Sequence, residues 1–235
     1  MIGLGTIANT GAVIVGSAIG MIIKGGLKQK YQDILMQALG LATLFIGASG
    51  AMAGMLKIIE NGIETQGSFL LIGSLVFGAL VGEFIDIEDK LERLGEFLKT
   101  KVRVKGDSTF VEGFVTSSLV ICVGAMAIVG SLQDGLQGDP STLFAKAILD
   151  FMIVMVFSST LGIGVMFSAL PLAIYQGSMT IFATFLTPFL TDIVISNLSF
   201  VGSVLIFAVG VNLTFGKRIK VGNMIPAMII PFFFH

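Results

Sequence analysis

Long apolar stretches separated by short polar segments repeat along the whole chain. A helix needs about 20 apolar residues to cross a bilayer core of about 30 Å. Seven stretches meet or approach that length, and an eighth, at 221–234, is shorter. The stretches are continuously apolar rather than alternating, which favours membrane-spanning helices over the strands of a barrel. The seven stretches are residues 3–23, 33–56, 68–86, 110–132, 142–169, 172–191 and 198–215.

Almost all positive charges lie in three segments between these stretches. Loops that face the cytoplasm are enriched in Lys and Arg, whereas acidic residues contribute little to orientation. We therefore predict a multi-pass protein with its N-terminus outside, the three basic segments inside, and Asp134, Asp139 and Asp192 outside. The N-terminal stretch lacks a basic leading region, so we expect a retained span rather than a cleaved signal peptide. The basic residues are Lys24, Lys28, Lys30, Lys90, Arg93, Lys99, Lys101, Arg103, Lys105, Lys217, Arg218 and Lys220.

The connection after the third stretch has a pattern of its own. Its apolar residues recur at helical spacing, and acidic and basic residues fill the other positions. This predicts an amphipathic helix along the cytoplasmic surface, or an extension of the third span that packs on a neighbouring subunit. The mixed charge argues against a polybasic lipid-binding patch. The apolar positions are Phe84, Ile87, Leu91, Leu94, Leu98 and Val102.

Small residues recur four positions apart in three of the odd-numbered stretches. This spacing lets helix backbones approach closely, either within one bundle, at a dimer interface or at a sliding contact. The sequences at 44–48 and 121–125 also resemble each other. Together the two patterns indicate either tandem helix hairpins in which all odd spans are parallel, or a chance recurrence of small residues. The repeat units would be 1–66, 67–138, 139–196 and 197–235 of one integral membrane domain. We expect the closest packing at Gly16, Gly20, Gly78, Gly82 and Gly164.

The composition argues against several classes of function. Charged residues make up 12% of the chain, against roughly 25% in soluble domains, and the net charge of −1 gives no reason to expect nucleic acid. His235 and Cys122 are the single histidine and cysteine, which excludes a histidine-rich metal site and an intrachain disulfide. Phosphate-binding loops, metalloprotease helices and nucleophile elbows are absent from the sequence. We therefore expect a protein that is not an enzyme and holds no cofactor.

Asp150 is the one acidic residue well inside a predicted span. Carboxylates within the membrane are costly and often serve as proton or cation sites. Lys146 lies one helical turn earlier, so the two residues form either a structural ion pair or part of a transport or gating site. Ser158 and Thr160 lie on the same span, each roughly 80° from the stripe of Asp150.

The segment 169–178 combines a proline and a glycine with polar side chains among apolar neighbours. It predicts either a tight cytoplasmic turn or a helix break that builds a binding site. If a solute path exists, we expect it between the fifth span and this break, in a shared cavity with Asp150 toward its outer mouth. More often such polar residues bond to their own or adjacent helices. The candidate path residues are Asp150, Ser158, Thr160, Tyr175, Gln176 and Asn212.

Five short motifs give the chain a resemblance to a known family. They lie at 5–9, 82–83, 159–164, 175–177 and 222–227. With them the chain resembles the bacterial membrane family known as domain of unknown function 554. The resemblance implies an all-α, multi-pass protein of the prokaryotic inner membrane, and it carries over no activity and no functional residues.

Three classes of function are compatible with the sequence. The first is a transporter or channel for an ion or small solute, the main alternative is a non-transporting scaffold or accessory subunit, and an intramembrane enzyme is the third. No span carries the several buried charges that a proton-coupled pump would need. The expected partners are the lipid bilayer and, through the small-residue faces, further copies of the same chain.

Overall fold

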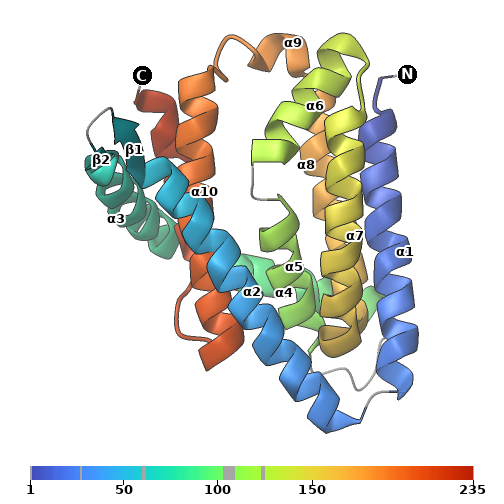
Figure 1. Ribbon diagram of the computed structural model, residues 1–235. Coiled ribbons are helices and arrows are strands. Elements are labelled where there is room, and N and C mark those ends of the chain that lie inside the picture. The colour runs from blue at the N-terminus through green and yellow to red at the C-terminus, as the bar shows by residue number, and fades with distance from the viewer. Residues whose placement is uncertain (1, 27, 60–61, 103–108, 123–124, 235) are drawn as a thin grey trace. The chain divides into compact units, whose positions relative to one another are not determined.

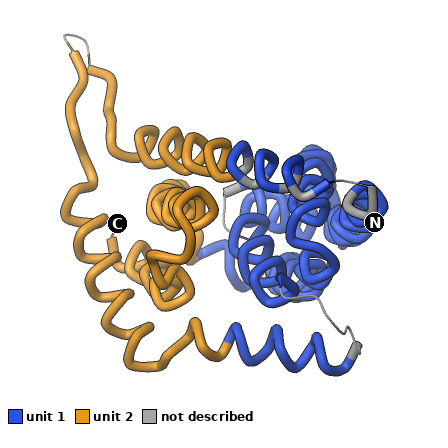
Figure 2. The backbone as a smooth tube through the Cα atoms, turned by 90° about the horizontal axis from the view of Figure 1, so that it is seen from below, with its two compact units in different colours: residues 1–39, 91–122, 126–188 blue, residues 40–90, 123–125, 189–235 orange. Residues whose placement is uncertain are grey.

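The chain folds mainly into helices that form two compact units (Figure 2). The computed structural model describes residues 2–26, 28–59, 62–102, 109–122 and 125–234. Arg103, Lys105 and His235 therefore lie outside the described residues. So do positions 123–124, which belong to the segment 121–125 that resembles 44–48. Unit 1 comprises residues 1–39, 91–122 and 126–188, and unit 2 comprises residues 40–90, 123–125 and 189–235.

Unit 1 is built around two helices in contact along their length, α1 (Leu4–Gly26) and α7 (Ser141–Leu161) (Figure 1). They run in the same direction, because Gly5 faces Leu143 at one end and Gly20 faces Met155 further along. Asp134, which we expected on the outer side, is buried against the start of α1 and accepts hydrogen bonds from the Gly3 and Gly5 amides. The other elements of unit 1 are α5 (Phe110–Cys122), α6 (Ala125–Gln137), the 3₁₀-helix η1 (Gly162–Ser168), α8 (Ala169–Ile181) and α9 (Ala183–Leu186).

Unit 2 contains two further close pairs of helices. The helix α3 (Ser68–Ile85) packs antiparallel to the 3₁₀-helix η2 (Gly222–Phe233), and α2 (Gln29–Met55) packs against α10 (Asp192–Phe215). Leu70, Phe200, Val201 and Ala227 form the buried core of this unit. The remaining elements are the antiparallel strands β1 (Leu56–Ile59) and β2 (Gly62–Thr65) and the start of α4 (Ile87–Val102).

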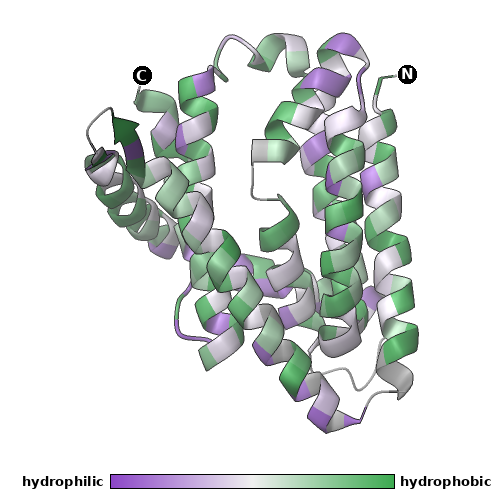
Figure 3. Ribbon diagram, viewed as in Figure 1, coloured by the Kyte–Doolittle hydropathy of each residue, from purple (hydrophilic) through white to green (hydrophobic). Residues whose placement is uncertain are grey.

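The distribution of apolar side chains is that of a membrane protein. Apolar residues cover the outer faces of the helices as well as their contacts (Figure 3), and Phe69 on α3 is 90% exposed. Among the described residues, five helical stretches are long and apolar enough to span a bilayer, and the bent pair of α5 and α6 would make a sixth. The protein is thus an all-α membrane protein, although the seven or eight predicted spans are not confirmed.

The difference in span count has two sources. The stretches 142–169 and 172–191, which we predicted as two spans, largely fall within one apolar helical stretch, Ser141–Ile181, made of α7, η1 and α8. This stretch folds back on itself, because Asn9 on α1 contacts both Asp150 on α7 and Gln176 on α8. The last stretch forms only the 12 residues of η2.

The prediction of irregular backbone at 169–178 was wrong, because these residues are helical in α8. The chain turns earlier, in η1, which begins at Gly162 with φ of 78°. Pro171 is instead the third residue of α8. In the first turn of a helix an N–H has no intrahelical partner, so a proline there removes no helix bond. The change of direction therefore occurs at Gly162, where glycine allows the positive φ, and residues 169–178 stay helical.

The predicted amphipathic helix is present as α4, but it begins three residues later than its pattern suggested. Asp86 has left-handed backbone geometry, with φ of 56°, and separates α3 from α4. Phe84 consequently belongs to α3 and is exposed, so it is not part of the apolar face of α4. Ile87 and Leu91 are half-buried.

Candidate functional site

A buried polar cluster lies between three helices of unit 1. Its side chains are Asn9 on α1, Lys146 and Asp150 on α7, and Gln176 on α8, and we call them the Asn9 cluster. None of the four is more than 6% exposed. Helical geometry puts Lys146 and Asp150, four residues apart, on one face of α7. The parallel packing of α1 against α7 then brings Asn9 beside Asp150.

Asp150 is the centre of the hydrogen bonds in the Asn9 cluster. Its Oδ2 accepts from Asn9 Nδ2 at 2.9 Å and from Lys146 Nζ at 2.5 Å. Lys146 Nζ also donates to the main-chain oxygen of Ile121 at 2.8 Å, in the last turn of α5. The negative end of a helix stabilises a cation, so Lys146 is held by both the carboxylate and α5. The pair has no net charge.

Two polar atoms of the Asn9 cluster have no partner among the described residues. Asn9 Nδ2 also donates to Gln176 Oε1 at 3.3 Å, which leaves Asn9 Oδ1 and Gln176 Nε2 without hydrogen bonds. The amide orientations follow from Asp150, because an ionised carboxylate only accepts and therefore requires the Asn9 nitrogen toward it. A buried polar atom without a hydrogen bond costs about 1–3 kcal/mol. The cluster therefore offers one free acceptor and one free donor.

The Asn9 cluster borders a broken helix. We predicted one span over 110–132, but α5 ends at Cys122 and α6 runs on at an angle of 63° to it. Broken helices are stable in a bilayer only where protein or water satisfies the freed backbone groups. Lys146 does so for Ile121. Such breaks build ion and solute sites in many transporters.

The structure brings together only some of the predicted path residues. Asp150 and Gln176 meet through Asn9, whereas Ser158 donates to the main-chain oxygen of Ser17 at 2.9 Å and Thr160 to that of Phe157 on its own helix at 2.9 Å. These hydrogen bonds do not join Ser158 and Thr160 to Gln176. Tyr175, on α8, is half-buried.

Asn212 belongs to unit 2, whereas the other predicted path residues belong to unit 1. Its Oδ1 accepts from the amides of Arg218 and Ile219, each at 2.9 Å, and its Nδ2 donates to the Ile219 oxygen at 2.7 Å. These bonds close the loop after α10. Asn212 therefore makes the local contacts that we named as the commoner alternative to lining a path.

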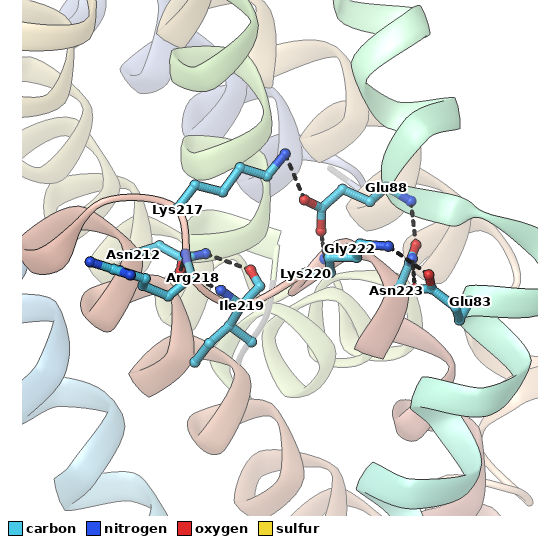
Figure 4. A network of polar contacts seen from close by, with 9 residues as sticks. All are labelled: Glu83, Glu88, Asn212, Lys217, Arg218, Ile219, Lys220, Gly222 and Asn223. Atoms are coloured by element: carbon cyan, nitrogen blue, oxygen red, sulfur yellow. Dashed lines mark hydrogen bonds and ion pairs between the residues drawn. The ribbon is translucent and has the colours of Figure 1, made fainter.

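A second polar cluster lies in unit 2 and joins the α3–α4 junction to the start of η2 (Figure 4). Asn223 Oδ1 accepts from the Glu88 amide at 2.6 Å, and Asn223 Nδ2 donates to Glu83 at 2.6 Å. The Glu88 carboxylate accepts from the Gly222 amide at 3.1 Å and pairs with Lys217 at 2.8 Å. We call these residues, with Lys220, the Asn223 network.

Lys220 completes the Asn223 network at its exposed edge. Its ammonium lies 2.5 Å from Glu83, and this hydrogen bond and the charge of Glu83 raise the pKa of Lys220. Any stability from this pair is therefore present below the usual lysine pKa and is lost as the pH rises through the raised value. Both side chains are more than half exposed, so solvent screens the pair.

The five glycines expected at close packing all face backbone of another element. A Cβ on Gly16 would lie 2.7 Å from the Phe151 oxygen of α7, and one on Gly20 would overlap the Met155 oxygen. Gly78 and Gly82 meet Ala227 and Asn223 of η2 in the same way, and Gly164 of η1 meets Phe110 of α5. All five therefore lie at close contacts between elements, as do further glycines such as Gly47 and Gly135.

The fold and the buried polar clusters together define an all-α, multi-pass membrane protein. The family described as protein of unknown function (DUF554) matches residues 4–235, and the chain belongs to this family. The motifs at 5–9 and 175–177 contribute to the Asn9 cluster, and those at 82–83 and 222–227 to the Asn223 network.

Two curated proteins are similar along their length. The uncharacterized membrane protein YdfK of Bacillus subtilis is 34% identical over 97% of this chain and 93% of its own. The uncharacterized protein YqgA of Escherichia coli is 26% identical over 97% of this chain and 94% of its own. No solved structure matches the chain.

Proposed function

We propose that the protein transports a small solute or ion across the prokaryotic inner membrane and binds it at the Asn9 cluster. The observation that supports this most directly is the pair of free groups, Asn9 Oδ1 and Gln176 Nε2, in a cluster buried among apolar helices. Buried polar groups in proteins almost always have a hydrogen-bond partner, so two unpartnered amide atoms within one cluster favour a binding role over a purely structural one. A ligand that binds only transiently needs protein atoms that can hydrogen-bond to it, and these two amide atoms could do so.

The residues of the Asn9 cluster would have different roles. Asn9 and Gln176 would contact the solute, while Asp150 holds Asn9 in place and Lys146 balances the charge of Asp150. The broken helix α5–α6 ends against Lys146, so a change in its bend would alter the position of the Lys146–Asp150 pair. Helix breaks of this kind take part in alternating access in other transporters.

Our proposal for the topology keeps the N-terminus outside and the three basic segments inside. It counts α7 and α8 as two spans and η2 as a short last span, for seven or eight in one domain with tandem hairpins. A 3₁₀-helix rises about 2.0 Å per residue, against 1.5 Å for an α-helix, so η2 reaches further than an α-helix of its length. Lipid is the partner we expect, and nucleic acid, cofactors and enzymatic activity are not part of the proposal. An oligomer through small-residue faces stays a prediction, since these glycines contact helices of their own chain.

Reconstitution tests the proposed function. Purified protein in liposomes should carry at least one member of a broad panel of ions and metabolites, and the Asn9→Leu and Asp150→Asn variants should carry it at least about tenfold more slowly. Gln37→Leu is the matched control, because Gln37 is exposed on α2. The alternative, a scaffold or accessory subunit, would be favoured if wild-type liposomes were no more permeable than empty ones to every member of the panel.

A further inference from the structure

We infer that the Asn9 cluster selects a neutral solute that carries both a hydrogen-bond donor and an acceptor, such as a small amide, urea or a polyol. This inference rests on the proposed transport function and specifies the chemical class of its substrate. It follows from the charge balance of the cluster, from which atoms remain free, and from how deeply they are buried.

The charges of the Asn9 cluster are already balanced. Lys146 and Asp150 form a direct pair, and each has a further partner, the Ile121 oxygen for Lys146 and the Asn9 amide for Asp150. A charged solute would bring an uncompensated charge into a site of low dielectric constant, where desolvation is expensive. A neutral solute brings no such charge. Charge balance therefore favours neutral substrates.

The free atoms also disfavour ions. Metal cations need several oxygen ligands that are not already neutralised, whereas the carboxylate of this cluster is paired with the Lys146 ammonium, and the amides add only Asn9 Oδ1 and Gln176 Oε1. An anion needs several donors, and here the one free side-chain donor is Gln176 Nε2, in a cluster that already contains the Asp150 carboxylate. One free acceptor and one free donor instead match a group such as a primary amide or a hydroxyl, which can donate and accept at the same time.

Burial sets the size of the solute. Asn9 and Gln176 are both fully buried and their amides are 3.3 Å apart, so the two free atoms lie on neighbouring groups within the packed helices. The solute must therefore be small. Two neutral hydrogen bonds give weak affinity, which suits a solute that is abundant and must leave the site quickly.

Stopped-flow light scattering of proteoliposomes tests the inference. Acetamide, urea and glycerol serve as neutral probes, and methylammonium, acetate, Na⁺ and K⁺ serve as charged probes. We expect the wild-type protein to accelerate entry of at least one neutral probe, with no measurable ionic current. Gln176→Met and Asn9→Leu should slow that entry by about tenfold, the effect of one lost neutral hydrogen bond. Gln37→Met should leave it unchanged.

The outcomes separate this inference from the proposed function. Cluster-dependent flux of a charged probe, detected as ionic current, would overturn the neutral class and keep transport. If the wild-type protein accelerates entry of a neutral probe and neither variant slows it, the Asn9 cluster is not the binding site and the inference is wrong, whereas transport itself stands. If the wild-type protein accelerates no neutral probe, the neutral class is wrong, and the broad panel decides on transport. Thermal unfolding checks that each variant is folded. Should Gln176→Met aggregate, Gln176→Leu replaces it, because this variant also removes the free donor and adds no charge.

Discussion

At the scale of single residues, the pair of Lys146 and Asp150 shows how two charges persist inside a membrane protein. Neither is more than 6% exposed, and together they have three short hydrogen bonds to each other, Asn9 and Ile121. Such pairs add little net stability over apolar replacements, because desolvation offsets their attraction. The loss of only one partner is different, since it leaves the other charge buried alone.

We predict that Lys146→Met lowers the free energy of unfolding by about 3–5 kcal/mol, and that the double variant Lys146→Met/Asp150→Leu recovers most of this loss. Chemical unfolding in detergent micelles measures both. The exposed Lys57→Met should change stability by less than about 0.5 kcal/mol. A double variant as unstable as the single one would show that an unpaired charge is not the cause.

Glycines on one helix provide a second residue-scale prediction. A Cβ on Gly82 would overlap the Asn223 oxygen of η2, whereas a Cβ on Gly73, on the same helix, would meet nothing within 4 Å. Gly82→Ala should therefore destabilise the protein by about 1–3 kcal/mol through overpacking. Gly73→Ala should be neutral or stabilising by up to about 1 kcal/mol, because alanine favours helix. Melting temperatures in detergent compare them, and equal values would contradict the close contact of α3 with η2.

At the scale of elements, the contact of α3 with η2 follows from the prolines of η2. Pro226 has no N–H to donate to the Asn223 oxygen three residues earlier, which frees this acceptor in the 3₁₀-helix. Gly82 lies against the same oxygen. The absence of a side chain lets the backbone of α3 approach it closely, as weak Cα–H···O contacts between helices require.

The Asn223 network provides a pH-dependent prediction for the α3–η2 contact. Asn223→Asp keeps an acceptor for the Glu88 amide but places a carboxylate against Glu83, where Asn223 Nδ2 now donates at 2.6 Å. At pH 8 we expect a loss of about 1.5–3 kcal/mol. At pH 5 the two carboxyls can share one proton, so the loss should shrink. Asn223→Leu should show no such recovery on acidification. An Asn223→Asp deficit independent of pH would argue against this geometry.

The sequence predicted those elements whose signal is local. Continuous apolar runs identified α1, α2, α3 and α10, and the i, i+4 spacing placed Lys146 beside Asp150. The hairpin of β1 and β2 was missed although the sequence has Asn61-Gly62, a hairpin signal. The strand that follows, Gly62–Thr65, has only one apolar residue, so no apolar run marked it. The break between α5 and α6 lies inside an apolar run, which cannot be told from a straight helix by periodicity.

The remaining errors concern contacts over long distances in sequence. Asn9 and Gln176 are 167 positions apart, and no local pattern pairs them. Ser158 and Thr160 were predicted as site residues because they are polar. In the structure their hydroxyls instead donate to main-chain oxygens, Ser158 to Ser17 and Thr160 to Phe157. Polar residues in a span can be listed from sequence, but their partners depend on which helices become neighbours.

At the scale of the whole molecule, orientation in the membrane is the property to test first. In a Cys122→Ser background, single cysteines at Lys28, Lys90 and Arg218 should be protected from an impermeant thiol reagent added to intact cells. Cysteines at Lys57 and Asp192, exposed in unit 2, should be labelled. Labelling of any of the first three positions would contradict the proposed orientation with the N-terminus outside.

The pairing of early with late helices fixes when this protein can finish folding during its synthesis. Asn9 cannot form its hydrogen bond until Asp150, 141 positions later, has been synthesised. Glu88 likewise needs Asn223, which lies 135 positions later. The face of α3 with Gly78 and Gly82 therefore meets lipid until η2 leaves the ribosome. Because apolar helices are individually stable in a bilayer, α3 can stay inserted before its partner helix is made. A premature stop before η2 would leave α3 inserted yet unpartnered, and we expect the cell to degrade that product.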